Sequence, residues 1–447
     1  MDLQQFDNIK TPLDELFSHK LTENGDDALS TTGNNLLDIL FMTEYYQNNL
    51  EDVKEKIGDS DIEKLFSMFI RDPRFGIGRR DLGRVLMKQA GVSPDDIVLA
   101  GRFDDLYADT QSCELVVPLE WVKYMWKEVL AGNELAKKWM PRFNTKHHLV
   151  ANGFCKVLGV SEKEYRKAIK CNTVENKLSD HRIDEIDFEK VPSLAMIKYY
   201  NRFSKESGFA DYLESVRSGE KKLNVSTTTV YDIYRNRDKI DADLFFDKLE
   251  KIPMNVCPIL DTSGSMHDAN DSIGKATSIA YYLAKCSTYA NNQVVSFSSR
   301  PQLLNIHEID YNYRYGNSNK FSRELNSIYT GDCSNTDFGA VIKLLKDLHS
   351  FPEYFVVLSD MEFDEGSSRS VREVFDLFDT LGVKSKIVWW NFNSRNSTVT
   401  VDKNEPRCIY LSGYNPTLLK YLESGFDGMK FLEKLLTEYA KNIGKDV

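Results

Sequence analysis

Five oxygen-bearing side chains in the second half of the chain have the types and order that a hard cation needs. They are Asp261, Ser263, Ser265, Thr336 and Asp360. The first three form a D-x-S-x-S string, in which a carboxylate and two hydroxyls can converge from one loop. An all-oxygen set with few charges suits Mg²⁺, which keeps several waters and open positions. We therefore expect a site for Mg²⁺ or another divalent cation.

The same residues do not suggest a catalyst. Ser263 has no histidine near it in a pattern that would activate its hydroxyl. His267 lies two residues beyond Ser265 on the same turn, where a solvated side chain is the simpler interpretation. We therefore expect that the chain is not an enzyme.

Apolar runs with the length of buried strands precede the cation ligands. Residues 256–260 come before Asp261, and residues 354–358 come before Asp360. Such runs alternate with helical patterns, which predicts a parallel, doubly wound sheet with a ligand site beyond the carboxyl ends of its strands. We expect strands at 256–260, 293–298, 302–306, 354–358, 386–392 and 408–411, and helices at 272–289, 338–348, 371–381 and 428–442.

Helical periodicity dominates the first half of the chain. We therefore expect two domains, a helical module at 1–253 and the sheet domain at 254–447. Ser60 can cap one of the helices, and Ser161 with Glu164 forms a capping box for another. Many short helices with little strand signal favour a stacked, solenoid-like array. Helices are expected at 35–53, 119–131, 135–140, 146–158, 161–170, 192–204 and 209–218.

The composition of the 447 residues is that of a globular protein, with 41 % hydrophobic and 28 % charged residues. No run of about 18 apolar residues is present, so we expect no transmembrane helix. The first residues lack the pattern of a signal peptide. Seven scattered cysteines without a C-x-x-C string fit free thiols in a reducing compartment, and we expect a cytoplasmic protein.

The net charge of −11 argues, at first sight, against a nucleic-acid partner. The charge is unevenly spread, however. Residues 71–88 hold six basic and two acidic residues, and residues 137–170 hold nine basic and two acidic. Clustered Lys and Arg create a local field that can bind phosphates whatever the total charge is. The candidate phosphate ligands are Arg71, Arg74, Arg79, Arg80, Arg84, Lys137, Lys138, Arg142, Lys146, Arg166, Lys167 and Lys170.

Four aromatic residues lie among these charges: Phe75, Trp139, Phe143 and Tyr165. Aromatic rings next to basic side chains can stack on unpaired bases. Taken singly, Trp139 and Tyr165 are better explained as core residues. A solvated basic face without any ligand is the alternative for the two stretches.

Two family resemblances rest on ordered strings of this sequence. The D-x-S-x-S string, Thr336 and Asp360 resemble the metal-ion-dependent adhesion site of a von Willebrand factor A domain. The whole chain resembles the Ro autoantigen family, in which a TROVE module precedes an A domain, and most closely an uncharacterised Ro-like group. The strings are LTENGDDALSTTGNNLLDILF at 21–41, FIRDPRFGIGRRDLGRVL at 69–86, KWMPR at 138–142, EYRKAIK at 164–170, KVPS at 190–193, VSFSSRPQLL at 295–304 and VLSDMEFD at 357–364.

The resemblance implies a module of HEAT-like helical repeats that can close into a ring on the A domain. It also implies a ribonucleoprotein component that binds small structured RNAs and the single-stranded ends of misfolded RNAs. This chain is more acidic than Ro-type RNA binders tend to be, which favours a restricted and salt-sensitive RNA site. The alternative is an adaptor that docks an acidic residue of a protein partner on the A-domain cation and binds no RNA.

Overall fold

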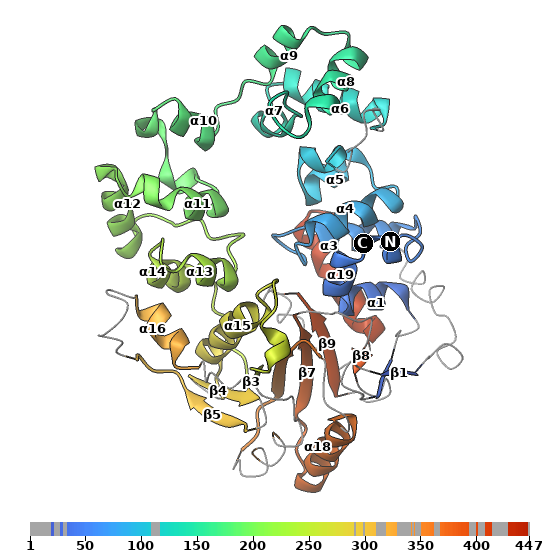
Figure 1. Ribbon diagram of the computed structural model, residues 1–447, viewed down its shortest axis with the longest axis vertical. Helices are drawn as coiled ribbons and strands as arrows, with labels where there is room; N and C mark the ends of the chain where they lie inside the picture. The colour runs from blue at the N-terminus through green and yellow to red at the C-terminus, as the bar shows by residue number, and fades with distance from the viewer. Residues whose placement is uncertain are drawn as a thin grey trace.

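An arc of short helices rests with both of its ends on a sheet domain in a computed structural model of the chain (Figure 1). The two expected parts are therefore present, a helical module followed by an α/β domain. The structure describes residues 19–21, 27–29, 34–108, 117–289, 292–297, 300–309, 319–328, 341, 344, 350–361, 367–392, 399–400, 407–413 and 428–445. No helix in these ranges is both long enough and apolar enough to span a bilayer.

The arc begins with a set of short helices on one side of the sheet domain. They are α1 (Asn35–Phe41), α2 (Thr43–Asn48), η2 (Leu50–Val53), α3 (Asp61–Arg71), α4 (Arg80–Gln89), α5 (Pro94–Ala100) and η3 (Phe103–Leu106). One helix over 35–53 was expected, and that prediction is wrong. The Thr43 hydroxyl donates to the carbonyl groups of Ile39 and Leu40 at 2.8 Å, and α1 ends at this point. Hydroxyls that bond back to a preceding turn commonly bend helices.

The arc continues through eleven further helices in chain order within the described ranges. They are α6 (Leu119–Leu130), α7 (Glu134–Trp139), α8 (His148–Leu158), α9 (Glu162–Ala168), α10 (Val174–Ser179), η4 (Ile183–Glu185), η5 (Phe188–Lys190), α11 (Ser193–Phe203), α12 (Ser207–Arg217), α13 (Val230–Asn236) and α14 (Ala242–Lys248). The expected capping box at the start of α9 is confirmed, because Ser161 and Glu164 bond each other's backbone N–H groups.

The sheet domain is built on six strands in the order β5-β4-β3-β6-β7-β9. Counted along the chain this is 3-2-1-4-5-6, a doubly wound order whose switch point lies between β3 and β6. The strands are β3 (Val256–Asp261), β4 (Gln293–Phe297), β5 (Gln302–Asn305), β6 (Tyr354–Ser359), β7 (Lys386–Asn391) and β9 (Cys408–Ser412). Only β5 is antiparallel to its neighbour within this sheet. Four residues separate it from β4, which is too short for the crossover that parallel strands need.

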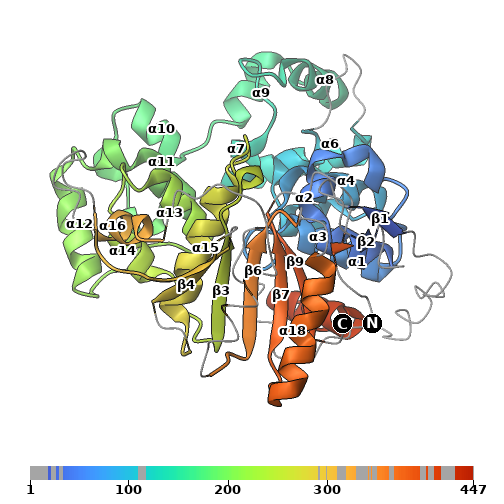
Figure 2. The same ribbon diagram turned by 60° about the horizontal axis from the view of Figure 1, so that its bottom comes forward.

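Side chains of alternate strand residues pack on opposite faces of the sheet. Leu260 and Val356 belong to the core that includes α15 (Ser272–Cys286) and α19 (Gly428–Asn442), while Ile259 and Val357 belong to the core that includes α18 (Ser367–Leu381). The expectation of helices on both faces is therefore confirmed (Figure 2). The remaining elements of the described residues are η6 (Gly264–Met266), α16 (Lys320–Asn326) and a small antiparallel sheet of β1 (His19–Leu21), β2 (Asp27–Leu29) and β8 (Val399–Thr400). The expected helix at 338–348 lies outside the described residues except for 341 and 344.

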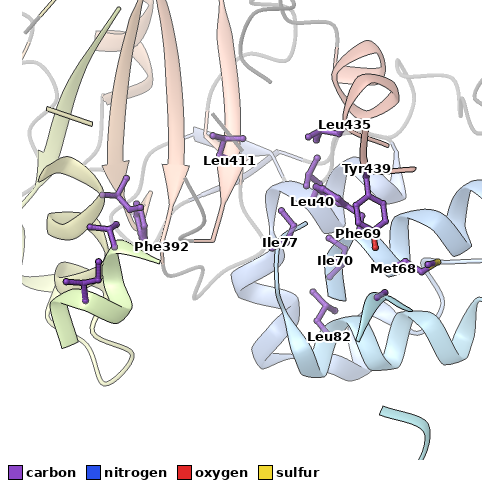
Figure 3. Close-up of a cluster of buried hydrophobic side chains, with 14 of the residues drawn as sticks. Leu40, Met68, Phe69, Ile70, Ile77, Leu82, Phe392, Leu411, Leu435 and Tyr439 are labelled. Atoms are coloured by element: carbon purple, nitrogen blue, oxygen red, sulfur yellow. The ribbon is translucent and has the colours of Figure 1, made fainter. Parts of the chain in front are cut away.

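The helix α19 joins the sheet domain to the first helices of the arc. Figure 3 shows Leu435 and Tyr439 of α19 beside Leu40 of α1 and Phe69 of α3. The rings of Tyr439 and Phe69 meet edge to face, with their centroids 5.5 Å apart. One continuous core therefore runs from the helical module into the sheet domain.

The other end of the arc is tied down by α13 and α14. The Asp243 carboxylate on α14 accepts hydrogen bonds from the backbone N–H groups of Lys320 and Phe321 at 3.1 and 2.7 Å. Asn319 donates to the carbonyl oxygen of Arg237 at 2.7 Å. Because both ends of the arc contact the sheet domain, the chain follows a closed circuit.

Candidate functional site

Two buried carboxylates mark the switch point of the sheet. Asp261 is the last residue of β3, and Asp360 directly follows β6; both are fully buried. The two strands are parallel neighbours with Leu260 paired to Leu358, so their carboxyl ends lie side by side. The Ser359 hydroxyl donates to Oδ2 of Asp261 at 2.5 Å. Ser359 was not among the five expected ligands, although it directly precedes Asp360 in the sequence.

The hydroxyls of the D-x-S-x-S string lie in the turn after β3. The Ser263 N–H donates to Oδ1 of Asp261 at 2.9 Å, and the Ser263 and Ser265 hydroxyl oxygens are 3.0 Å apart. Four of the five expected ligands therefore lie at the ends of β3 and β6. The fifth, Thr336, lies outside the described residues.

The electrostatics of this edge disfavour two ionised carboxylates side by side. Burial raises the pKa of Asp261, and the nearby charge of Asp360 raises it further. The groups that bond the Asp261 carboxylate in the described part of the chain are neutral, namely the Ser359 hydroxyl and the Ser263 N–H group. Two like charges held together away from water are costly unless a proton or a cation compensates them.

The oxygen ligands at this edge are of the kind that Mg²⁺ prefers, but the described residues alone do not fill its coordination shell. Carboxylate and hydroxyl oxygens are hard ligands of the kind Mg²⁺ prefers. Within the described ranges, no three His, Cys, Asp or Glu side chains gather closely enough to hold a metal ion. The serine hydroxyls, and any water ligands, would therefore have to complete the coordination.

The basic residues of the 71–88 stretch are largely engaged in ion pairs inside the protein. Arg71 and Arg84 are only 2 % and 5 % exposed, and both bind the buried carboxylate of Asp105. Arg84 also pairs with Asp104. A phosphate cannot reach these two guanidinium groups in this structure, so we correct their assignment to an RNA surface. They stabilise the packing of α3, α4 and η3.

The other arginines of this stretch also have carboxylate partners. Arg79 pairs with Glu44 on α2, while Arg74 pairs with Asp72 at 3.2 Å and Arg80 with Asp81 at 3.3 Å. Arg79 is mostly covered, whereas Arg74 and Arg80 are exposed. Since several of these acidic partners lie outside residues 71–88, the positive charge counted along this stretch does not equal the charge on its surface.

The 137–170 stretch presents a different surface. Lys137 and Lys138 pair with Glu134 and Glu175 at 2.8 and 3.1 Å, and Arg166 pairs with Glu162 at 2.7 Å. Arg142 donates to the carbonyl oxygen of Lys137. Five further lysines are exposed and make no ion pair within the described residues. We call Lys146, Lys156, Lys163, Lys167 and Lys170 the α8–α9 lysines.

The four aromatic candidates divide into buried and accessible rings. Tyr165 is fully buried, stacks on Trp126 and donates from its hydroxyl to the carbonyl oxygen of Pro141, so it is a core residue. Trp139 is half-buried with Arg102 over its ring. Phe143 has the Arg166 guanidinium 4.7 Å from its ring centre, and Phe75 lies beside Arg74.

The fold and site thus define a helical arc closed on a doubly wound sheet that carries two buried carboxylates at its switch point. The family profile of a domain of unknown function (DUF2828) matches residues 154–256, and that of a second domain of unknown function (DUF7788) matches residues 254–441. An uncharacterized protein, L728, of Acanthamoeba polyphaga mimivirus is 23 % identical over 360 residues. That match covers 69 % of this chain and 61 % of the relative's length.

One solved structure similar to this chain is the Ro (RSR) protein of Deinococcus radiodurans. The superposition covers 93 % of this chain and 88 % of that chain, with a TM-score of 0.36 and 12 % sequence identity.

Proposed function

We propose that the chain is a non-enzymatic RNA-binding protein whose RNA contacts lie on the helical arc at the α8–α9 lysines. The observation that carries this proposal is the exposure of these five lysines without ion-pair partners in the described residues of an acidic chain. Their ammonium groups are available to phosphates. The resemblance of sequence strings to the Ro family supports the same function.

Binding would combine phosphate contacts with limited stacking. The lysines and Arg166 would hold phosphates, and Phe143, which already lies under Arg166, would offer the edge of its ring to an unpaired base. The acidic remainder of the surface would confine RNA to this region. Affinity would fall steeply with salt, because each phosphate contact releases condensed counterions.

The test is a fluorescence anisotropy titration of a single-stranded RNA at several salt concentrations. We expect Lys167→Ala/Lys170→Ala to weaken binding roughly 25-fold at 0.1 M salt. The slope of log K against log salt should become shallower by about 1.4, since each single-strand contact contributes about 0.7.

A matched control removes two exposed lysines of the sheet domain, Lys384→Ala/Lys441→Ala. This control should bind RNA like the unaltered protein. If both double variants bind equally well, or if no RNA binds at low salt, the α8–α9 lysines are not an RNA surface.

We also propose that Asp261, Ser263, Ser265 and Asp360 hold a divalent cation, with Mg²⁺ as the best candidate. The support is the pair of buried carboxylates at adjoining strand ends. The cation would brace the switch point, and an open position on it could accept a carboxylate of a protein partner. A partner docked there without any RNA binding is the adaptor alternative.

Thermal unfolding tests the cation. After chelation, millimolar Mg²⁺ should raise the melting temperature of the unaltered protein and should leave Asp261→Asn unchanged, because the amide lacks the charge that binds the ion. If Mg²⁺, Mn²⁺ and Ca²⁺ all left the melting temperature of the unaltered protein unchanged, the proposed cation site would be wrong.

A further inference from the structure

A cavity of about 240 Å³ lies where the two ends of the helical arc meet the sheet domain. Its walls come from three parts of the chain. Pro73 and Arg74 follow α3, and residues 225–230 lead into α13. Residues 248–250, Ile252 and Tyr282 belong to the junction with the sheet domain. None of these residues belongs to the cation site or to the α8–α9 lysines.

One wall of this cavity carries a buried hydroxyl without a bond. Thr228 is 8 % exposed, and its Oγ1 has no hydrogen-bond partner within the described residues. The neighbouring hydroxyls are engaged, since Thr227 bonds Ser193 and Thr229 bonds Asp232. Leaving a buried hydroxyl unsatisfied costs about 1–3 kcal/mol, so this group calls for a partner, either an ordered water or a bound ligand.

Two basic side chains and one acidic side chain line the cavity. Lys248 is half-buried and makes no ion pair in the described part of the chain. Arg74 is 43 % exposed; its Nε and Nη2 donate to Asp72, and Nη2 also donates to the carbonyl oxygen of Leu99, so Nη1 is the nitrogen left for a ligand among the described contacts. The opposing charge is Glu250, whose side chain is exposed at the rim. Since Asp72 balances Arg74 and Glu250 opposes Lys248, the cavity is close to neutral, and its donors for an anion are the Thr228 hydroxyl, the Lys248 ammonium and Nη1 of Arg74.

We propose that this cavity binds a phosphate group. A phosphate oxygen can accept from the Thr228 hydroxyl and from the Lys248 ammonium at once, and the Arg74 guanidinium can bind a second oxygen. The volume is below the roughly 300–1,000 Å³ of sites that enclose drug-sized ligands. The ligand is therefore inorganic phosphate or the terminal phosphomonoester of a larger molecule whose remainder stays in solvent.

A phosphate held here would join the parts of the chain that close the arc. Arg74 belongs to the first helices, Thr228 to the segment before α13, and Lys248 to the end of α14. Bonds from one ligand to all three would oppose their separation. Binding should therefore raise the melting temperature, because only the closed protein offers the complete set of donors.

Isothermal titration calorimetry with inorganic phosphate on the full chain, purified in phosphate-free buffer, tests the site. We expect Thr228→Val and Lys248→Gln each to weaken binding at least tenfold. Lys239→Gln, which removes another lysine of the same part of the arc, should leave binding unchanged. Thr228→Val keeps the shape of the side chain and removes only an unbonded hydroxyl, so its urea midpoint should not fall.

Two probes distinguish the sources of the phosphate. A 5′-phosphorylated RNA dinucleotide that competes with inorganic phosphate, while its 5′-hydroxyl form does not, would indicate a terminal phosphomonoester. Binding of inorganic phosphate alone would indicate the free ion. The proposal would be overturned if 10 mM inorganic phosphate produced no heat of binding. It would also be overturned if Thr228→Val, Lys248→Gln and Lys239→Gln bound phosphate with equal affinity. These results do not depend on Lys167 and Lys170, so they leave the RNA surface to its own test.

Discussion

Asp105 holds two buried arginines at once. Its carboxylate accepts from Nε of Arg71 at 3.0 Å and from the Arg84 guanidinium, and it also accepts from the backbone N–H of Arg102 at 2.8 Å. All three side chains of this cluster are buried. Removing one member of a buried ion-pair network is costly, because the remaining charges keep their desolvation penalty and lose their compensation.

Asp105→Asn should therefore lower the free energy of unfolding by about 3–5 kcal/mol. Urea denaturation followed by tryptophan fluorescence measures this change. Asp81→Asn provides the comparison, because Asp81 also contacts Arg84 but is 47 % exposed, and its loss should cost less than about 1 kcal/mol. If both variants lost the same free energy of unfolding, the buried network would stabilise the fold no more than the exposed pair does.

Sequence reasoning could place the two candidate cation ligands Asp261 and Asp360 together, but it could not identify the carboxylate partners of the arginines, and the difference is physical. Asp261 and Asp360 lie next to apolar strands whose pairing follows from their pattern, so their meeting could be predicted. Asp105 lies 34 residues from Arg71, and no periodicity links the two positions. The charge at the surface of the 71–88 stretch therefore could not be derived by counting along the chain.

Lys275 is a buried base at the contact between α15 and the arc. Burial lowers its pKa to about 8, and the nearby charge of Arg79 lowers it further. The unfolded chain keeps the ordinary value near 10.5. Below pH 8 both states hold the proton, and the folded state bears the full cost of the buried charge. As the pH rises from 8 to 10.5, the folded protein releases this proton first, so this group contributes increasing stability.

Lys275→Met should raise the free energy of unfolding at pH 7 by about 1–3 kcal/mol, since it removes the buried charge and keeps the length of the side chain. The gain should shrink as the pH approaches 10. Urea midpoints of both proteins at pH 7, 8.5 and 10 measure this difference. A loss of stability at pH 7 would mean that the ammonium group is favourably compensated in the fold.

At the scale of elements, α19 stands out because it packs on both the sheet domain and the helical module. Its residues 428–442 were expected as an amphipathic helix of the sheet domain, and the helix has these bounds. Its buried face, however, covers α1 and α3 of the helical module as well. The Tyr439 hydroxyl even approaches the buried carboxylate of Asp72 at 3.4 Å. Amphipathicity predicts that a face is buried, but it does not identify the surface that buries it.

Leu435→Ala should lower the free energy of unfolding by about 2–5 kcal/mol, because Leu435 is fully buried between the two parts of the chain. Glu438 lies on the exposed face of the same helix. Glu438→Ala should therefore change the free energy of unfolding by less than about 0.5 kcal/mol. Chemical denaturation measures both. If Leu435→Ala were as mild as the control, α19 would not join the two parts in solution.

Other elements also separate what the apolar pattern of the sequence predicts from what it misses. The strand runs at 256–260, 354–358 and 386–392 were predicted close to their observed positions, because parallel strands buried on both faces are continuous apolar runs. The direction of β5 and the break after α1 were missed. The first depends on a connection of four residues and the second on a single threonine hydroxyl, and neither changes the apolar pattern.

At the scale of the whole molecule, the closed circuit explains how an acidic chain can carry a localised basic surface. The α8–α9 lysines lie on the part of the arc far along the chain from either attachment to the sheet domain. The acidic pair Asp261 and Asp360, in contrast, lies at the switch point of the sheet. The two proposed ligands of opposite charge would therefore bind to different parts of a chain whose hydrophobic core is continuous.

The contact between α19 and α1 also has a consequence for how the protein is made. Phe41 and Gly428 are 387 positions apart in the chain. At about 5–20 residues per second, a ribosome needs roughly 20–80 seconds between synthesising the first of these helices and beginning the second. During that interval the apolar side of α1 and α3 lacks its cover. Nascent chains of this protein should therefore depend on chaperones that bind exposed hydrophobic segments until translation reaches the last helix.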